Sequence, residues 1–172
     1  SKLEVNALFR LLSKYITIEL NELHKQNIRV SIMGRIGGLP ARAQADLQHC
    51  IDLTKSNTAM VVNVALNYGG RAEIADAAKH LAKEAVAGKL QPDSIDEATF
   101  AKYLYVPQLP DPDLLIRTSG ELRLSNFMLW QMSYAEIVVL PTFWPDFRKS
   151  HLYEAIAEFQ ARQRRFGGRV KK

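Results

Sequence analysis

Arginine and hydroxyl side chains are concentrated in one short segment of the sequence, residues 117–127. The segment contains Arg117, Arg123 and Ser125, together with further serine, threonine and asparagine side chains. Guanidinium groups pair bidentately with the oxygens of a phosphate, and hydroxyl groups supply additional donors. We therefore expect this segment to bind a diphosphate, although a polar surface loop in which Glu121 pairs with an arginine would have the same composition.

Two glycines and an arginine form a second candidate segment, Gly69, Gly70 and Arg71. Glycine lets the backbone approach a ligand closely, and the first turn of a following helix offers N–H groups at the positive end of its dipole. These residues therefore suit a diphosphate cradle. A tight turn whose glycines only supply positive φ explains the same residues equally well, and both interpretations stay open.

Acidic residues suggest two places where a metal could bind. Glu136 stands at the start of an apolar run, where an unpaired carboxylate is costly. It would either bind a hard cation such as Mg²⁺ or form a structural salt bridge, which is the commoner case. Asp111 and Asp113 form an Asp-x-Asp pair of the kind that holds a metal in nucleotide-sugar transferases, but the neighbouring prolines favour a turn.

Hydrophobic periodicity predicts alternating helices and strands along the whole chain. The predicted helices are 4–25, 41–55, 71–87, 96–105 and 146–165, and the predicted strands are 28–33, 59–66, 114–118 and 136–140. This alternation predicts an α/β fold in which a mostly parallel central sheet is flanked by helices, with residues 1–172 as a single domain. Ligands of such sheets bind beyond the carboxyl ends of the strands, where both arginine-containing segments fall.

Composition excludes several classes of protein. The 172 residues are 47% hydrophobic and 24% charged, which is typical of a globular domain and excludes a disordered or collagen-like chain. No apolar run approaches the roughly 18–20 residues of a membrane-spanning helix. The single cysteine, Cys50, excludes an internal disulfide and sits among apolar positions typical of a core. With no signal-peptide pattern, these features predict a cytoplasmic protein.

Positive charge is concentrated at the end of the chain. The net charge is +5, and eight basic residues but only two acidic ones follow Phe147. Such a tail can attract nucleic acid, an anionic membrane surface or phosphorylated ligands, although a solvated helix face explains it more simply. Because no aromatic residues are interleaved for base stacking, we expect no nucleic-acid partner, and peripheral contact with a membrane surface stays open.

Five motifs occur in a fixed order along nearly the whole chain. They are Asn-Tyr-Gly-Gly-Arg at 67–71, Arg-Thr-Ser-Gly-Glu with Arg-Leu-Ser-Asn-Phe at 117–127, Tyr-Ala-Glu at 134–136, Trp-Pro-Asp-Phe at 144–147 and Arg-Arg-Phe-Gly-Gly at 164–168. This series resembles the cis-prenyltransferases, and most of all the bacterial undecaprenyl diphosphate synthases. Five motifs in sequence are far more specific than any one of them.

The resemblance implies a magnesium-dependent enzyme that condenses isopentenyl diphosphate onto an allylic diphosphate, typically farnesyl diphosphate. The product would be a long cis-polyprenyl diphosphate such as undecaprenyl diphosphate, and the enzyme would be a homodimer. By resemblance, Glu136 binds magnesium, and the C-terminal arm reaches the partner's active site. The substrate-binding residues that we expect are Gly69, Gly70, Arg71, Arg117, Arg123, Leu124, Ser125, Arg165 and Gly167.

Two segments of the family are not found in this sequence. Members carry an Asp-Gly-Asn-Gly-Arg-Trp phosphate loop and a later Ser-x-Glu-Asn-Trp segment, and Ser1 matches a point just after them. We expect that the sequence is either part of a longer enzyme or a truncated product. Leu122 stands where the best-known member has a metal-associated histidine, so we expect no ligand there, and the sequence does not identify the catalytic residue.

Two other functions remain as alternatives. Non-catalytic partner subunits of cis-prenyltransferases keep the C-terminal Arg-x-Gly but tend to lose the Arg-Thr-Ser-Gly-Glu region, which is present here at 117–121. A nucleotide-sugar transferase that uses Asp111 and Asp113 is the weaker alternative. The sequence therefore favours the enzyme.

Overall fold

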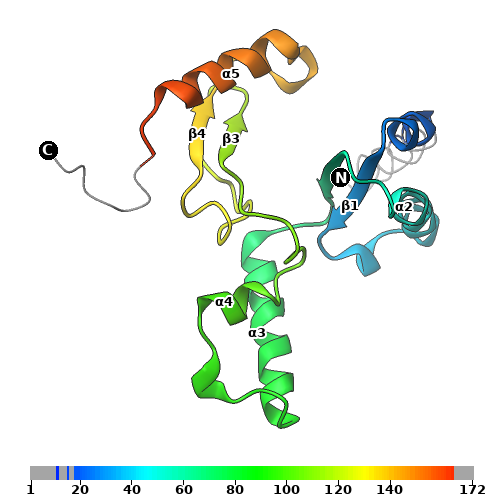
Figure 1. Cartoon of the computed structure of the whole chain (residues 1–172), viewed down its shortest axis with the longest axis vertical. Coiled ribbons are helices and arrows are strands. Elements are labelled where there is room, and N and C mark those ends of the chain that lie inside the picture. The colour runs from blue at the N-terminus through cyan, green and yellow to red at the C-terminus, as the bar shows by residue number, and fades with distance from the viewer. Residues whose placement is uncertain (1–10, 12–14, 16–17, 165–172) are drawn as a thin grey trace, which may run out of the picture. The chain divides into compact units, whose positions relative to one another are not determined.

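The computed structural model describes residues 11, 15 and 18–164 (Figure 1). The chain falls into two compact units, Ser1–Gly69 and Gly70–Lys172. Each unit contains one pair of parallel strands: β1 (Ile28–Met33) with β2 (Met60–Ala65), and β3 (Leu114–Arg117) with β4 (Glu136–Val139). Parallel pairing and alternating helices confirm the α/β class, whereas the single-domain organisation stays a prediction.

In the first unit, α2 (Ala41–Thr54) connects the two strands and packs against β1. Its buried residues Ala43, Leu47, Cys50 and Thr54 recur at helical spacing, which gives the helix one apolar face. The Thr54 hydroxyl donates to the Cys50 carbonyl and accepts from the N–H of Val30, at 2.7 and 2.9 Å. This fixes the end of α2 to the middle of β1.

Two small clusters form the core of this unit. Residues 18–25 are helical, and Leu20 packs with Val30 and Cys50. Cys50 is 2% exposed, as expected from its spacing, and burial is the main reason that the pKa of its thiol is raised. The second cluster contains Leu39, Ala43 and Leu47.

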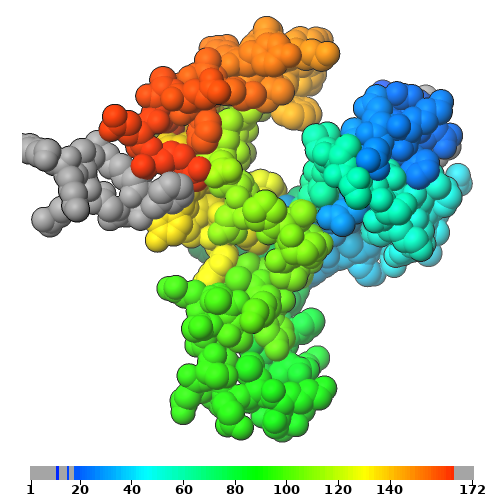
Figure 2. All heavy atoms as spheres, in the orientation of Figure 1, coloured from blue at the N-terminus to red at the C-terminus, as the bar shows by residue number. Residues whose placement is uncertain are grey.

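The second unit begins with α3 (Gly70–Val86), which ends before Gly88 at φ 72°, as expected for a glycine after a helix. Single turns and a short helix follow: η2 (Pro92–Ser94), α4 (Glu97–Ala101) and, after β4, η3 (Trp144–Asp146). α5 (Lys149–Ala161) lies against the strand pair (Figures 1 and 2), where Ala155 packs with Val138 and Leu140.

Two helices are shorter than the periodicity predicts. α4 covers Glu97–Ala101 because Asp96 caps its first turn and the chain continues as turns towards residue 105. α5 starts at Lys149 because Pro145 lies in the separate turn η3, and it ends at Ala161 because Arg162 is extended, at φ −87° and ψ 150°. In the part of the chain that the structure describes, no helix is both long and apolar enough to cross a membrane.

Candidate diphosphate-binding site

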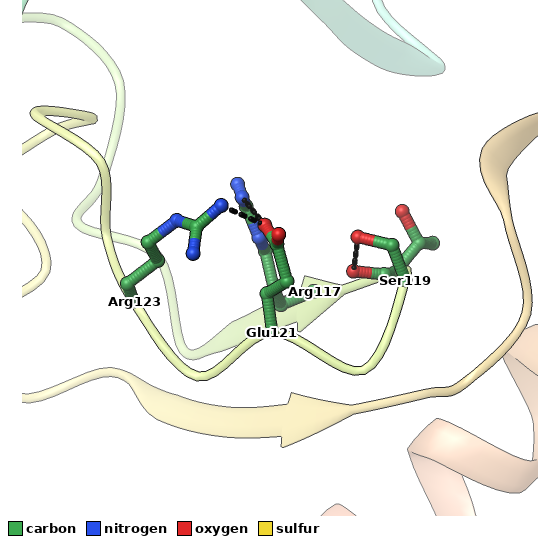
Figure 3. Close-up of polar contacts among 5 residues, drawn as sticks. Arg117, Ser119, Glu121 and Arg123 are labelled. Atoms are coloured by element: carbon green, nitrogen blue, oxygen red, sulfur yellow. Dashed lines mark hydrogen bonds and ion pairs between the residues drawn. The ribbon is translucent and has the colours of Figure 1, made fainter.

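Arg117 and Arg123 converge on one carboxylate at the end of β3 (Figure 3). Glu121 Oε2 accepts from Arg117 Nη2 at 2.8 Å and from Arg123 Nη2 at 2.5 Å. The Arg117 side chain is 30% exposed and that of Arg123 is 60% exposed. Two cations and one anion leave a net positive charge, which suits an anionic ligand, although the pairing expected of a surface loop is present too.

Backbone hydrogen bonds fix the turn that carries Glu121. The N–H groups of Ser119 and Gly120 donate to the carbonyl groups of Thr142 and Leu140, each at 2.9 Å. Ser119 and Gly120 both adopt positive φ, 65° and 69°, which reverses the chain directly after the strand. The turn is therefore attached to the segment that follows β4.

Asn126 connects the two segments that the sequence analysis selected. Its carbonyl accepts from the N–H of Gly70 at 2.7 Å, and its Oδ1 accepts from the N–H of Arg71 at 2.9 Å. Ser125 and Asn126 both have positive φ, 49° and 64°, a strained conformation that is concentrated at functional sites in proteins. The loop after β3 thus caps the start of α3.

This cap changes the interpretation of the glycine segment. The N–H groups of Gly70 and Arg71 are already paired with Asn126, whereas the Arg71 side chain is exposed. A Cβ at Gly70 would lie 2.8 Å from Leu129 Cγ, so this glycine permits close packing. Gly69 is buried, and the binding of a diphosphate by these residues stays a prediction.

Leu124 and Ser125 are the other two expected substrate-binding residues of this loop. The Leu124 carbonyl accepts from the N–H of Phe127 at 3.0 Å, and the Leu124 side chain is half-buried. Ser125 is exposed, so its hydroxyl is accessible from solvent. Arg165 and Gly167, the two expected substrate-binding residues of the C-terminal arm, lie outside the described residues.

Glu136 lies at the opposite end of the strand pair from Arg117. The register places Glu136 beside Leu114 and Arg117 beside Val139. Three strand steps of about 3.3 Å therefore separate the levels of Glu136 and Arg117, or about 10 Å. Glu136 starts β4 at its amino end, whereas ligands of parallel sheets bind beyond the carboxyl ends.

Glu136 is paired with an arginine in this structure. Its Oε2 accepts from Arg162 Nη1 at 3.0 Å, and this bond is the main reason that the pKa of the Arg162 guanidinium is raised. Over residues 11, 15 and 18–164, no group of three His, Cys, Asp or Glu side chains could hold a metal ion. The salt bridge weighed in the sequence analysis is thus present, and the magnesium role of Glu136 stays a prediction. Asp113 likewise pairs with a cation, Arg164.

The sequence analysis missed a buried polar cluster on α3. Glu73 is 1% exposed, and its Oε1 accepts from the N–H of Tyr105 at 3.0 Å and from Gln131 Nε2 at 3.2 Å. It shares one face of α3 with the buried Ala77 and Leu81. That i, i+4, i+8 spacing was visible in the sequence and could have identified Glu73 as a buried carboxylate.

Acidification should test the pairing of Glu121. Its pKa lies below the ordinary value, first because Arg117 donates to it and then because of Arg123. A lowered folded-state pKa adds stability above the unfolded-state pKa of about 4.3, and this stability is lost as the pH falls through the folded-state value. We expect the melting temperatures of the native protein and of Glu121→Gln to differ by the same amount at every pH between 7 and about 5. Below about pH 5 the two melting temperatures should converge. A difference that stays constant on acidification would contradict the pairing.

The sequence matches known proteins over almost its whole length. A family model described as "Putative undecaprenyl diphosphate synthase" matches residues 1–167. The isoprenyl transferase of Heliobacterium mobile is 54% identical over 165 residues, and that of Bacillus subtilis (strain 168) is 47% identical over 167. These alignments cover 96% and 97% of this chain but 64% of each relative, so the chain spans slightly less than two thirds of their length.

Solved structures agree with the sequence matches. Lavandulyl diphosphate synthase from Lavandula x intermedia, in complex with dimethylallyl diphosphate, superposes with a TM-score of 0.94 at 38% identity, covering 97% of this chain and 72% of that one. A probable undecaprenyl diphosphate synthase from Campylobacter jejuni gives a TM-score of 0.85 at 34% identity, covering 97% and 76%. Since the family model matches almost every residue, this chain belongs to the undecaprenyl diphosphate synthase family, the cis-prenyltransferases that its motifs resemble.

Proposed function

We propose that the protein transfers prenyl groups, condensing isopentenyl diphosphate onto an allylic diphosphate. Farnesyl diphosphate is the proposed starter, and a long cis-polyprenyl diphosphate such as undecaprenyl diphosphate is the proposed product. The observation that carries this proposal is the cluster of Arg117, Glu121 and Arg123 at the carboxyl end of β3, in a chain of this family. A structural neighbour that binds dimethylallyl diphosphate supports the substrate class.

Arg117 has a buried hydrogen-bond donor with which a diphosphate could pair. Its Nε is buried and has no hydrogen-bond partner among the described residues, although Nη2 is paired with Glu121. A buried N–H without a partner is costly, and a phosphate oxygen would satisfy it. We propose that Arg117 and Arg123 bind isopentenyl diphosphate, with Ser125, Leu124 and the arm residues completing the site.

An apolar cavity in the first unit supports the binding of a prenyl chain. Apart from Glu19 and Tyr15, its lining is non-polar: Leu20, Leu23, Val30, Ile32, Leu47, Cys50, Val62 and Val64. A growing polyprenyl chain needs a surface of this kind, since it gains about 0.8 kcal/mol per buried CH₂. The helix that ends at residue 25 and strand β2 are therefore the proposed walls of the chain-binding surface.

Magnesium is proposed from the family resemblance. When bound, Mg²⁺ would neutralise diphosphate charge and stabilise the leaving group. Glu136 is the residue that we propose to bind this ion, although no group of three His, Cys, Asp or Glu side chains among the described residues could hold a metal ion.

We also propose a homodimer in the cytoplasm, whose basic tail can contact a membrane surface. Large apolar side chains are exposed in the second unit, where a partner subunit would cover them: Leu122 at 76%, Tyr134 at 62%, Phe143 at 65% and Trp144 at 70%. In this dimer, Arg165 and Gly167 of the arm would complete the partner's site.

The decisive experiment measures incorporation of labelled isopentenyl diphosphate into polyprenyl products. The protein is expressed from its complete coding sequence and supplied with farnesyl diphosphate and Mg²⁺. We expect cis-polyprenyl diphosphates from the protein alone. Transfer that requires an added catalytic homologue would identify a partner subunit instead, and hydrolysis of nucleotide sugars with no prenyl transfer would indicate the weaker alternative.

A further inference from the structure

We infer that Asn126 is a positioning residue for Ser125. It attaches the turn that carries Ser125 to the first turn of α3, and this attachment sets how well the loop after β3 binds a diphosphate. The inference deepens the proposed function, on which its kinetic part rests, because it names a residue that acts on the proposed diphosphate site through its neighbour.

Ser125 and Asn126 are the two central residues of a four-residue turn. The N–H of Phe127 donates to the Leu124 carbonyl at 3.0 Å, which closes the turn. Both central residues have positive φ, 49° and 64°, as in a type I′ turn. Asparagine adopts this conformation more readily than most residues, but serine is not among those enriched there. The conformation of Ser125 therefore costs free energy, and it persists because the neighbouring structure fixes it.

Asn126 fixes this turn through two hydrogen bonds to the start of α3. Its carbonyl accepts from the N–H of Gly70 at 2.7 Å, and its Oδ1 accepts from the N–H of Arg71 at 2.9 Å. The first N–H groups of a helix have no partner within the helix, so a residue from elsewhere in the chain can pair with them. Bonds through both the main chain and the side chain of one residue define the position and the direction of the turn.

The segment that follows the turn is attached to the same helix. A Cβ at Gly70 would lie 2.8 Å from Leu129 Cγ and 3.0 Å from the Leu129 nitrogen, so α3 starts directly against this segment. Near the end of the first helical turn, Glu73 accepts from Gln131 Nε2 at 3.2 Å. These contacts keep Asn126 within reach of the helix.

The attachment determines where the Ser125 hydroxyl lies in the loop. Ser125 is exposed and follows Arg123 by two positions, and both are proposed to bind the same diphosphate. A hydroxyl that is already fixed loses less conformational freedom when it binds a ligand, so it contributes more to affinity. Because Asn126 occupies the N–H groups of Gly70 and Arg71, these two groups support diphosphate binding through the turn that they hold.

The first test measures hydrogen exchange of single backbone amides in the protein from its complete coding sequence. Asn126→Gly keeps the carbonyl and tolerates positive φ but removes Oδ1, so the Arg71 amide should exchange about two- to tenfold faster. Asn126→Asp keeps an acceptor and should keep exchange slow. Unchanged exchange at Arg71 in Asn126→Gly, or fast exchange in Asn126→Asp, would overturn the attachment.

The second test measures the KM and kcat for isopentenyl diphosphate and, by titration calorimetry, its Kd. Asn126 is exposed, so water competes for its bonds and a moderate effect is expected. Asn126→Gly should raise KM and Kd about two- to tenfold with a smaller change in kcat. In a Ser125→Ala background, the same change should have almost no further effect, because Asn126 acts through Ser125. Additive effects, or an unchanged KM in Asn126→Gly, would overturn the positioning role.

Asn27 provides a matched control in the first unit. It has φ 57°, its carbonyl accepts from the N–H of Ala59 at 2.9 Å, and its Oδ1 accepts from the N–H of Thr58 at 3.0 Å. Asn27→Gly should therefore speed exchange at Thr58 and leave the KM for isopentenyl diphosphate unchanged. An equal rise of KM in Asn27→Gly and Asn126→Gly would contradict a local effect on the diphosphate site.

The exchange and binding measurements separate this inference from the proposed function. Neither needs turnover, so both can be read even if the complete protein transfers no prenyl group. Absence of transfer together with slow exchange at Arg71 that depends on Asn126 would refute the proposed function and retain the attachment. Prenyl transfer with an Arg71 amide that is indifferent to Asn126 would do the reverse.

Discussion

Replacing Arg117 with alanine should raise the KM for isopentenyl diphosphate by about 10- to 150-fold, because a lost charge-assisted hydrogen bond costs about 1.5–3 kcal/mol. Arg117 ends β3, its side chain is 30% exposed, and its buried Nε has no hydrogen-bond partner among the described residues. The same replacement of Arg123, which is 60% exposed, should have a smaller effect. Steady-state kinetics with varied isopentenyl diphosphate measure both.

Two further variants separate the role of Arg117 from loss of positive charge. Arg117→Lys keeps the charge but not the planar fork of donors, so it should recover only part of the affinity. Arg42→Ala removes an exposed arginine from α2 and should leave the KM unchanged. Unaltered kinetics in both Arg117→Ala and Arg123→Ala would defeat the assignment of this cluster to substrate.

Replacing Glu73 with alanine should lower the free energy of unfolding by about 3 kcal/mol, because the part-buried Tyr105 N–H and the buried Gln131 amide both lose this acceptor. Glu73 Oε1 accepts from the Tyr105 N–H and from the Gln131 amide, and the side chain is 1% exposed. It thereby joins α3 to the segment after α4 and to the segment before β4. Urea denaturation of the full-length protein measures the loss.

The control for Glu73 is on the same helix. Glu84→Ala removes a carboxylate whose side chain is 36% exposed and whose partner, Lys89, is 3.8 Å away, and it should change stability by less than about 1 kcal/mol. Glu73→Ala with Gln131→Leu should lose less than the sum of the two single changes, because one unpaired donor is then removed. Equal stability losses in Glu73→Ala and Glu84→Ala would contradict the buried-cluster role.

Strand positions were predictable because each strand is an apolar run bounded by turn residues. β1 matches the predicted 28–33, and β2 is one residue shorter than the prediction at each end. Helix ends were predicted less well, since apolar spacing does not report where a turn interrupts a helix. The predicted end of α5 at Arg165 is wrong because Arg162 leaves the helix to reach Glu136.

The candidate site was predictable in its residue types but only partly in its contacts. Arg117 and Arg123 were found because arginines beside a strand end are conspicuous in any sequence. The cap that Asn126 places on α3 joins residues 55 positions apart, and no local pattern reports such a contact. Glu136 was conspicuous as a carboxylate beside apolar residues, but its partner depends on how α5 returns to the strands.

Because Cys50 is buried, its reaction with alkylating reagents can report local opening of the protein. The thiolate is the species that alkylating reagents attack, and burial of this thiol, reinforced by Asp46, disfavours it. Since Cys50 is the only cysteine of these 172 residues, its alkylation at neutral pH would follow transient opening of the cluster that it forms with Leu20 and Val30. The rate of labelling, measured with and without a prenyl diphosphate, would then report how firmly a bound chain closes the first unit.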